Sequence, residues 1–173
     1  MPADAGPSGA EPTYRQATPN DAAAIAAVGG AVLKELGEGS GLPGPMTADA
    51  VAQRIAGYAR TGGQTARRGR LPGDRGAMFV CAADGDVCGF AALEPEPQEE
   101  GCAVMGVWLQ PSARRKGIGR ELALMALEFA RAAGYAKVRG TLPAGNEAAL
   151  AFFSEIGALA QVVGGGMQYE LPL

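Results

Sequence analysis

The sequence predicts one domain of the α/β (α+β) class, with a mixed, mostly antiparallel sheet of six to seven strands and helices on both faces. Its 173 residues suit a single domain with a real core. Short apolar runs typical of strands alternate with amphipathic helical patterns along the chain. Two glycine-containing turns, at 84–86 and 164–166, join neighbouring runs and indicate hairpins.

A tail precedes the expected domain. Residues 1–12 are rich in Pro, Gly and Ala and lack periodicity, so we expect disorder there and a folded domain over residues 13–173. Residues 14–18 then alternate as a short strand does. The N-terminus has neither a basic nor an apolar segment, and so does not resemble a signal peptide.

Two helices should follow this strand. Asn20 or Asp21 can cap the first, which runs to about Leu36. After a loop rich in Gly and Pro, Thr47 is placed to cap the second. Gly62-Gly63 should end it, since glycine is the usual residue just past a helix C-terminus.

Three apolar runs in the middle of the chain predict three strands, at 77–82, 87–93 and 102–109. Asp84-Gly85-Asp86 between the first two is a strong hairpin signal. A loop rich in Pro and Glu separates the second strand from the third.

The apolar period changes after the third of these strands. Ile118, Leu122, Met125 and Phe129 are spaced by four, three and four, which predicts one apolar stripe on a helix over residues 118–133. The remaining elements are expected in this order: a strand at 137–142, a helix capped by Asn146 and stopped by Gly157, and a hairpin of strands at 159–163 and 167–171.

Composition excludes several classes of function. The net charge of −3 gives no basic field for nucleic acid, and no stretch approaches the roughly 18–20 apolar residues of a membrane span. We therefore expect neither a nucleic-acid nor a membrane partner. The three cysteines lack CxxC spacing and predict reduced, buried thiols in the cytoplasm; they are Cys81, Cys88 and Cys102.

The sequence contains no histidine. Serine and cysteine nucleophiles that depend on histidine are therefore excluded, as is every zinc site that needs imidazole. We expect no metal. The chemistry must use carboxylates, tyrosine, lysine, backbone dipoles or a cofactor.

The segment VWLQPSARRKGIGRE, residues 107–121, carries the clearest functional signal. A strand ends at Leu109 and a helix starts near Gly117, so unpaired N–H groups and the positive end of the helix dipole meet there. Glycines at 117 and 119 let a phosphate approach those amides. Four cations surround them, which favours a pyrophosphate site over an ordinary basic loop; they are Arg114, Arg115, Lys116 and Arg120.

Two familiar phosphate loops fit this segment poorly. The string GxxxxGK[ST] of a Walker loop does not occur. A dinucleotide fingerprint needs GxGxxG, and Leu122 stands where the third glycine should be. The acid expected about 20 residues later is replaced by the basic stretch Lys137-Val138-Arg139.

Arg114 to Gly119 instead matches [RQ]-x-x-G-x-[GA] between a strand and a long helix, and the chain resembles the GNAT superfamily of acyl-CoA-dependent N-acyltransferases. The element order matches over roughly residues 13–171, and the segment from Asn146 to Ala158 is similar to the family's N-x-x-A-x-x-[FL]-Y-x-x-x-G-F. The resemblance implies acetyl-CoA as co-substrate, an amine of a small molecule or peptide as acceptor and, by analogy, a homodimer. It implies these cofactor-binding residues: Val107, Trp108, Leu109, Arg114, Arg115, Lys116, Gly117, Ile118, Gly119, Arg120, Asn146 and Phe153.

One departure from the family pattern bears on the mechanism. Where the family usually places a tyrosine that protonates the leaving thiolate, this chain has Phe153, which cannot donate a proton. Another donor could serve, such as Ser154, Tyr135 or an ordered water. The thiolate could also leave unassisted, or the protein could bind acyl-CoA without efficient turnover.

A carboxylate is the natural base for an amine nucleophile in a protein without histidine. Glu94 ends the second strand of the 84–86 hairpin and is the first candidate, with Glu100 the second. The alternative is a solvated acidic loop over residues 94–100. If this loop faces the site, its charge favours a cationic acceptor.

The sequence therefore predicts an N-acetyltransferase in which the acceptor amine attacks acetyl-CoA directly within a ternary complex. The main alternative is a catalytically weak acyl-CoA-binding or sensor module, motivated by Phe153. A nucleotide-binding domain that uses Gly117-Ile118-Gly119 for NAD or ATP is a second rival, but it requires a parallel sheet.

Overall fold

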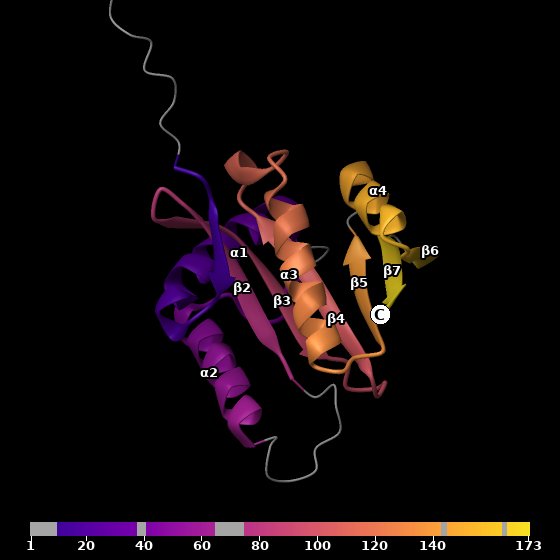
Figure 1. Ribbon diagram of the computed structural model, residues 1–173. Coiled ribbons are helices and arrows are strands. Elements are labelled where there is room, and N and C mark those ends of the chain that lie inside the picture. Colours follow the sequence, from indigo (N-terminus) through magenta and orange to yellow (C-terminus); the bar gives the residue numbers. More distant parts are fainter. Residues whose placement is uncertain (1–9, 38–40, 65–74, 143–144, 164–165) are drawn as a thin grey trace, which may run out of the picture.

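The computed structural model describes residues 10–37, 41–64, 75–142, 145–163 and 166–173. Within these ranges seven strands form one sheet with the order β1-β2-β3-β4-β5-β7-β6 (Figure 1). All neighbouring strands pair antiparallel except β4 and β5, which are parallel. The strands are β1 Thr13–Gln16, β2 Ala77–Ala83, β3 Asp86–Pro95, β4 Cys102–Leu109, β5 Lys137–Leu142, β6 Leu159–Val163 and β7 Gly166–Pro172.

Four α-helices in the described part of the chain cover both faces of this sheet (Figure 1). They are α1 Ala22–Leu36, α2 Ala48–Gln64, α3 Ile118–Ala132 and α4 Glu147–Glu155. Short 3-10 turns precede α1 at Pro19–Asp21 and follow β4 at Pro111–Ala113. The predicted fold class and element order are confirmed. Residues 1–9 of the expected tail lie outside the described residues.

The sheet separates two apolar cores, because successive side chains of a strand point to opposite faces. In β2, Met78 and Val80 pack with α1 and α2, whereas Phe79 packs with α3. The α1–α2 core also contains Ile25, Val28, Val32, Val51, Ile55, Phe90 and Trp108. The opposite core, under α3 and α4, contains Leu122, Leu127, Phe153, Tyr169 and Met105.

Local signals account for the ends of most elements. The Thr47 hydroxyl accepts a hydrogen bond from the Ala50 N–H at 3.2 Å, and the Asn146 side chain accepts one from Ala149 at 3.1 Å, so these two predicted caps are confirmed. Asp21 is the N-cap residue of α1 but its side chain makes no capping hydrogen bond, because its carboxylate accepts from the preceding Thr18 N–H at 2.8 Å. Asp84 and Gly85 both have positive φ, as a type I′ hairpin turn requires.

Two boundary details differ from the prediction. Helix α2 continues to Gln64, past the glycines expected to stop it, because glycine costs an interior helix position only about 1 kcal/mol. The apolar stripe of α3 is rotated: Met125 and Phe129 are only half-buried. Small residues let α3 approach the sheet closely, and its buried face consists of Ile118, Leu122, Ala123, Ala126, Leu127 and Ala130.

Strands β4 and β5 pair over only three residues, from Cys102–Lys137 to Val104–Arg139. Beyond this point β4 continues to Leu109 and β5 to Leu142 without pairing to one another. The sheet is therefore split on one side of a parallel contact, and the start of α3 lies at the far end of the split. No helix among the described residues is long and apolar enough to cross a membrane.

Candidate active site

Only every second residue of β4 directs its main-chain N–H and C=O groups towards the split. The Gln110 N–H donates to the Cys88 carbonyl, and the Glu96 N–H donates to the Cys102 carbonyl, both at 2.9 Å. Even-numbered residues of β4 therefore pair with β3. Because N–H and C=O groups of alternate residues point to opposite edges of a strand, the odd-numbered residues face β5. The three that extend past the last β4–β5 pair are Met105, Val107 and Leu109.

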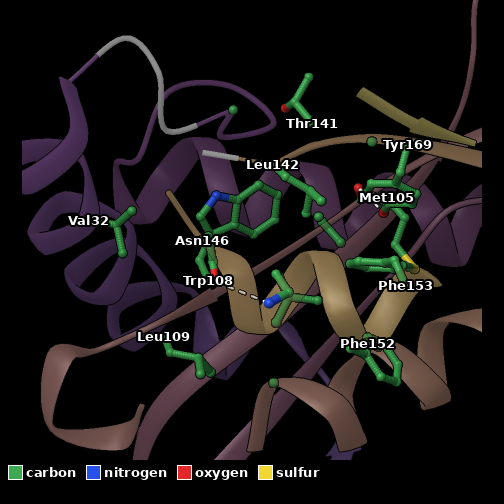
Figure 2. A pocket seen from close by; sticks show the side chains of 18 of the residues that line it. Val32, Met105, Trp108, Leu109, Thr141, Leu142, Asn146, Phe152, Phe153 and Tyr169 are labelled. Atoms are coloured by element: carbon green, nitrogen blue, oxygen red, sulfur yellow. Dashed lines mark hydrogen bonds between the residues drawn. The ribbon is translucent and has the colours of Figure 1, made fainter. Parts of the chain in front are cut away.

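A cavity of about 1040 Å³ follows this split, at the upper end of the roughly 300–1,000 Å³ typical of ligand sites. Its wall combines β3, β4, β5, β7, α1, the start of α3, α4 and the segment around residues 41–43, and Figure 2 shows part of this wall. All but two of the predicted cofactor residues line it: the side chain of Lys116 is exposed and that of Ile118 is buried in the core. Trp108 both packs on Phe90, at 5.0 Å between rings, and lines the cavity.

The loop before α3 contains two residues with left-handed backbone conformation. Arg115 and Gly117 both have positive φ, 63° and 80°, and Gly117 is the N-cap of α3. Consecutive turns of this kind aim main-chain N–H groups into one concavity, and the first N–H groups of α3 have no partner within the helix. A Cβ at Gly119 would lie 3.4 Å from Leu109 and 3.9 Å from Val107, in ordinary van der Waals contact with the side of β4 that lines the cavity.

The arginines near this loop have different partners. Arg114 donates to both oxygens of Glu35, at 2.7 and 2.8 Å, and to the Leu109 carbonyl at 3.2 Å. These hydrogen bonds lower the pKa of the Glu35 carboxyl below its usual value. Arg120 lies over the Phe152 ring at 5.2 Å and 3.5 Å from Glu155. Arg115 and Arg120 are the exposed cations of the cavity wall.

Phe153 lies inside the cavity and its ring is stacked on that of Tyr169, with centroids 3.9 Å apart and planes 17° from parallel (Figure 2). The Tyr169 hydroxyl donates to the Met105 carbonyl at 3.1 Å. Ser154 is exposed and is not part of the wall. Tyr135 is also outside the wall, and its hydroxyl donates to the Arg75 carbonyl at 2.6 Å.

Tyr169 was not singled out by the sequence. The signal that could have identified it is Gly140, a glycine inside a strand, which often marks a close approach by another group. A Cβ at this position would collide with the Tyr169 hydroxyl and with the Met105 carbonyl oxygen.

Glu94 lies in the cavity wall at the level of Val104, its register partner on β4. Its carboxylate is 3.1 Å from the Arg54 guanidinium and accepts a hydrogen bond from the Tyr58 hydroxyl. Burial and this hydrogen bond raise the pKa of Tyr58, so the phenol stays protonated and remains a donor.

The other acidic residues of the 94–100 loop differ in whether they line the cavity. Glu96 lines the cavity, whereas Glu100 is exposed and does not. Glu99 forms ion pairs with Lys137 and Arg139, at 2.5 and 2.6 Å. The expected acidic patch therefore contributes two carboxylates to the cavity, Glu94 and Glu96.

Charged side chains lie at both ends of the cavity. The start of α3, with Arg115 and Arg120, lies beyond Leu109, whereas Glu94 lies beside Val104. Five residues of strand separate these ends, about 16 Å at the rise of a β-strand. The arrangement suits a long ligand with phosphates at the α3 end and main-chain contacts along β4; at the other end Arg139, the β5 partner of Val104, lines the cavity together with Glu94 and Glu96. Within the described ranges, no group of three or more Cys, Asp or Glu could hold a metal ion.

Comparisons with known proteins agree with this geometry. Residues 49–158 match the model of the acetyltransferase (GNAT) family, which covers more than half of the chain. No curated protein matches the sequence.

Three solved structures with similar folds represent the many that match. An N-acetyltransferase from Staphylococcus aureus Mu50 is 23% identical, with a TM-score of 0.69 over 94% of this chain and 99% of that chain. A ribosomal-protein-alanine N-acetyltransferase from Brucella melitensis is 22% identical, with a TM-score of 0.69 over 93% and 99%. A phosphinothricin acetyltransferase from Sinorhizobium meliloti, in complex with AcCoA, is 18% identical, with a TM-score of 0.72 over 94% and 88%. The family match over residues 49–158, on a fold shared with these enzymes, shows that the chain belongs to the GNAT acetyltransferase family and is an acyltransferase.

Proposed function

We propose that this chain transfers an acetyl group from acetyl-CoA to a primary amine of a small-molecule or peptide acceptor. The observation that carries the proposal is the split between β4 and β5, which ends at the glycine-containing start of α3. Solved relatives of this fold are described as complexes with acetyl-CoA or coenzyme A, which supports the same co-substrate here.

In this proposal the phosphates bind the main-chain N–H groups from Gly117 to Arg120, with Arg115 and Arg120 supplying charge. Amide groups of the pantetheine arm pair with the main chain of Val107 and Leu109, in the place that a neighbouring strand would take. Asn146, whose side chain caps α4 and lines the cavity, lies beside the arm.

The transfer proceeds by direct attack in a ternary complex. The amine nitrogen attacks the thioester carbonyl carbon, the carbon–sulfur bond breaks, and the acetyl group is transferred to nitrogen. Main-chain N–H groups of β4 stabilise the negative charge on the carbonyl oxygen. Direct attack is favoured over an acyl-cysteine because Cys102 is outside the cavity wall and burial raises the pKa of its thiol.

Glu94 is the proposed base, acting on the amine through a water, and Glu94 and Glu96 attract a cationic acceptor. Arg54 and Tyr58 both contact the Glu94 carboxylate and fix its orientation for this role. All three cysteines are free thiols, which fits a reducing compartment, and we place the reaction in the cytoplasm.

The test combines binding and turnover. Acetyl-CoA at 100 times its Kd should add about 2.7 kcal/mol of stability and raise Tm by about 5–10 °C. Free thiol should then appear when acetyl-CoA is mixed with a panel of primary amines, and the acetylated amine should be detected by mass. A Tm shift with NADPH or ATP but none with acetyl-CoA contradicts the proposal.

One observation favours a second candidate, a catalytically weak acyl-CoA-binding module: the phenyl ring of Phe153 stands where the family places its proton donor. This candidate predicts the same Tm shift with acetyl-CoA and no thiol release with any amine. Measurable acetyl transfer excludes it.

A further inference from the structure

Tyr169 reaches across β5 to the point where the sheet splits. It is the register partner of Gly140, and its ring passes over this glycine to place the hydroxyl against the Met105 carbonyl of β4. Met105 is the first residue of β4 beyond its last pair with β5, Val104–Arg139. The hydroxyl therefore lies at the apex of the split. A glycine inside a strand lowers the free energy of unfolding by about 0.5–1 kcal/mol relative to alanine. The close approach of Tyr169 to Met105 over Gly140 is therefore kept although it lowers stability.

Tyr169 also lies beside the residue that replaces the family's donor. Its ring stacks directly on Phe153, and both rings are part of the cavity wall (Figure 2). Among the described residues of that wall, Tyr169 is the one with a phenol. Thr141 also lines the cavity, but its hydroxyl is a far weaker acid than a phenol, whose usual pKa is about 10.

We propose that the Tyr169 hydroxyl, and not a group on α4, donates the proton to the leaving thiolate; this inference rests on the proposed function. When the carbon–sulfur bond breaks, its electron pair stays on sulfur and the hydroxyl proton moves to that sulfur. Glu94 takes up the amine proton through cavity water, and this proton then passes through water to the phenolate, which restores the phenol and the Glu94 carboxylate. The net reaction replaces one amine N–H by N–acetyl and releases the free thiol.

The surroundings of Tyr169 suit this role. The hydroxyl proton can rotate about the C–O bond, so it can leave the Met105 carbonyl and turn into the split without movement of the ring. Burial raises the pKa of Tyr169, so the phenol is protonated at neutral pH and its proton is available for transfer. Phe153 then acts as a packing surface that fixes the ring.

The experiment compares Tyr169→Phe with Tyr135→Phe, using acetyl-CoA and the best amine from the panel. Tyr135 is a matched control because it is also buried and also donates to a carbonyl, that of Arg75, outside the cavity wall. A general acid contributes roughly 10²–10⁴-fold, so Tyr169→Phe should lower kcat at least about 10²-fold and leave the Kd for acetyl-CoA unchanged. Tyr135→Phe should keep the wild-type kcat. A structural role would instead lower stability and acetyl-CoA affinity together.

Substitution at the neighbouring ring gives a second, independent readout. The double variant Phe153→Tyr/Tyr169→Phe should regain most of kcat, because a hydroxyl is restored on the stacked ring.

The proposal is overturned if Tyr169→Phe retains wild-type kcat, or if its loss of kcat is matched by Tyr135→Phe or accompanied by a weaker Kd for acetyl-CoA. It is also overturned if Phe153→Tyr alone raises kcat about 10-fold or more, because the wild-type enzyme would then lack an effective donor. Absence of thiol release by the wild-type protein would overturn the proposed function itself, and that outcome is seen before any variant is compared.

Discussion

Arg114 forms a two-pronged ion pair with Glu35, with N–O distances of 2.7 and 2.8 Å, that links the last turn of α1 to the loop before α3. The same guanidinium donates to the Leu109 carbonyl at the end of β4. Arg114 therefore joins a helix, a strand and the proposed phosphate loop, and we expect it to hold that loop in place.

Arg114→Ala should raise the Kd for acetyl-CoA by about 10-fold, equivalent to about 1.4 kcal/mol, because the loop loses contacts to both α1 and β4. Glu35→Gln should raise it less, by about 2- to 3-fold, since an exposed ion pair contributes about 0–1 kcal/mol. Isothermal titration calorimetry measures both. A larger effect of Glu35→Gln than of Arg114→Ala would contradict this order.

Gly119→Ala should weaken acetyl-CoA binding by about 10-fold or more without destabilising the fold, because the added methyl group occupies the approach to the α3 amides. The structure has room for that methyl group, which would meet Leu109 at 3.4 Å. Gly30→Ala on α1 is the matched control, since a Cβ there meets nothing within 4 Å and Gly30 is outside the cavity wall. Both variants should gain helix stability, and the Kd of Gly30→Ala should equal that of wild type. Equal Kd values for the two variants would argue against a phosphate site at α3.

The elements that sequence predicted best are those defined by local signals. The Asp84-Gly85 turn, the Thr47 and Asn146 caps and the strand–glycine–helix order around Leu109 and Gly117 all depend on neighbouring residues, so periodicity and turn chemistry were enough.

What the sequence could not predict depends on contacts between distant segments. Tyr169 meets Met105 across 64 positions and Tyr58 meets Glu94 across 36. Both contacts follow from strand register and helix docking, which no local pattern encodes. The acidic loop illustrates the same limit, because its composition did not reveal that Glu94 and Glu96 enter the cavity while Glu100 does not.

Glu94→Gln should lower kcat/KM for a cationic amine by about 10- to 100-fold, because it removes a negative charge beside the proposed acceptor. The Kd for acetyl-CoA should not change, because no charge near the proposed phosphate loop is altered. Glu100→Gln is the control, because Glu100 was the second candidate base and its side chain is outside the cavity wall. Steady-state kinetics with varied amine concentration distinguish the two. If Glu100→Gln has the larger effect, the 94–100 loop must adopt another arrangement during turnover.

An ion pair between the buried Asp21 and the half-exposed Arg15 predicts the pH dependence of stability. The Asp21 carboxylate accepts hydrogen bonds from Arg15, at 2.6 and 2.7 Å, and from the Thr18 N–H at 2.8 Å. The Arg15 contact is the main cause that lowers the pKa of Asp21 from 3.8 to about 2. Because the folded pKa is below the unfolded one, the stabilisation is complete above about pH 4 and is lost as pH falls towards about 2.

Asp21→Asn should therefore reduce the free energy of unfolding at pH 7 by about 1–2 kcal/mol. This loss is smaller than the pKa shift of Asp21 alone implies, because water screens the half-exposed Arg15. The difference from wild type should shrink as pH falls from 4 to 2. Urea unfolding across this range measures it. Arg15→Gln and the double variant complete a mutant cycle, in which the coupling energy should follow the same pH course. A difference between wild type and Asp21→Asn that is the same at pH 7 and pH 2 would show that Asp21 acts through its hydrogen bond to Thr18 and packing, because those contacts do not require the charge.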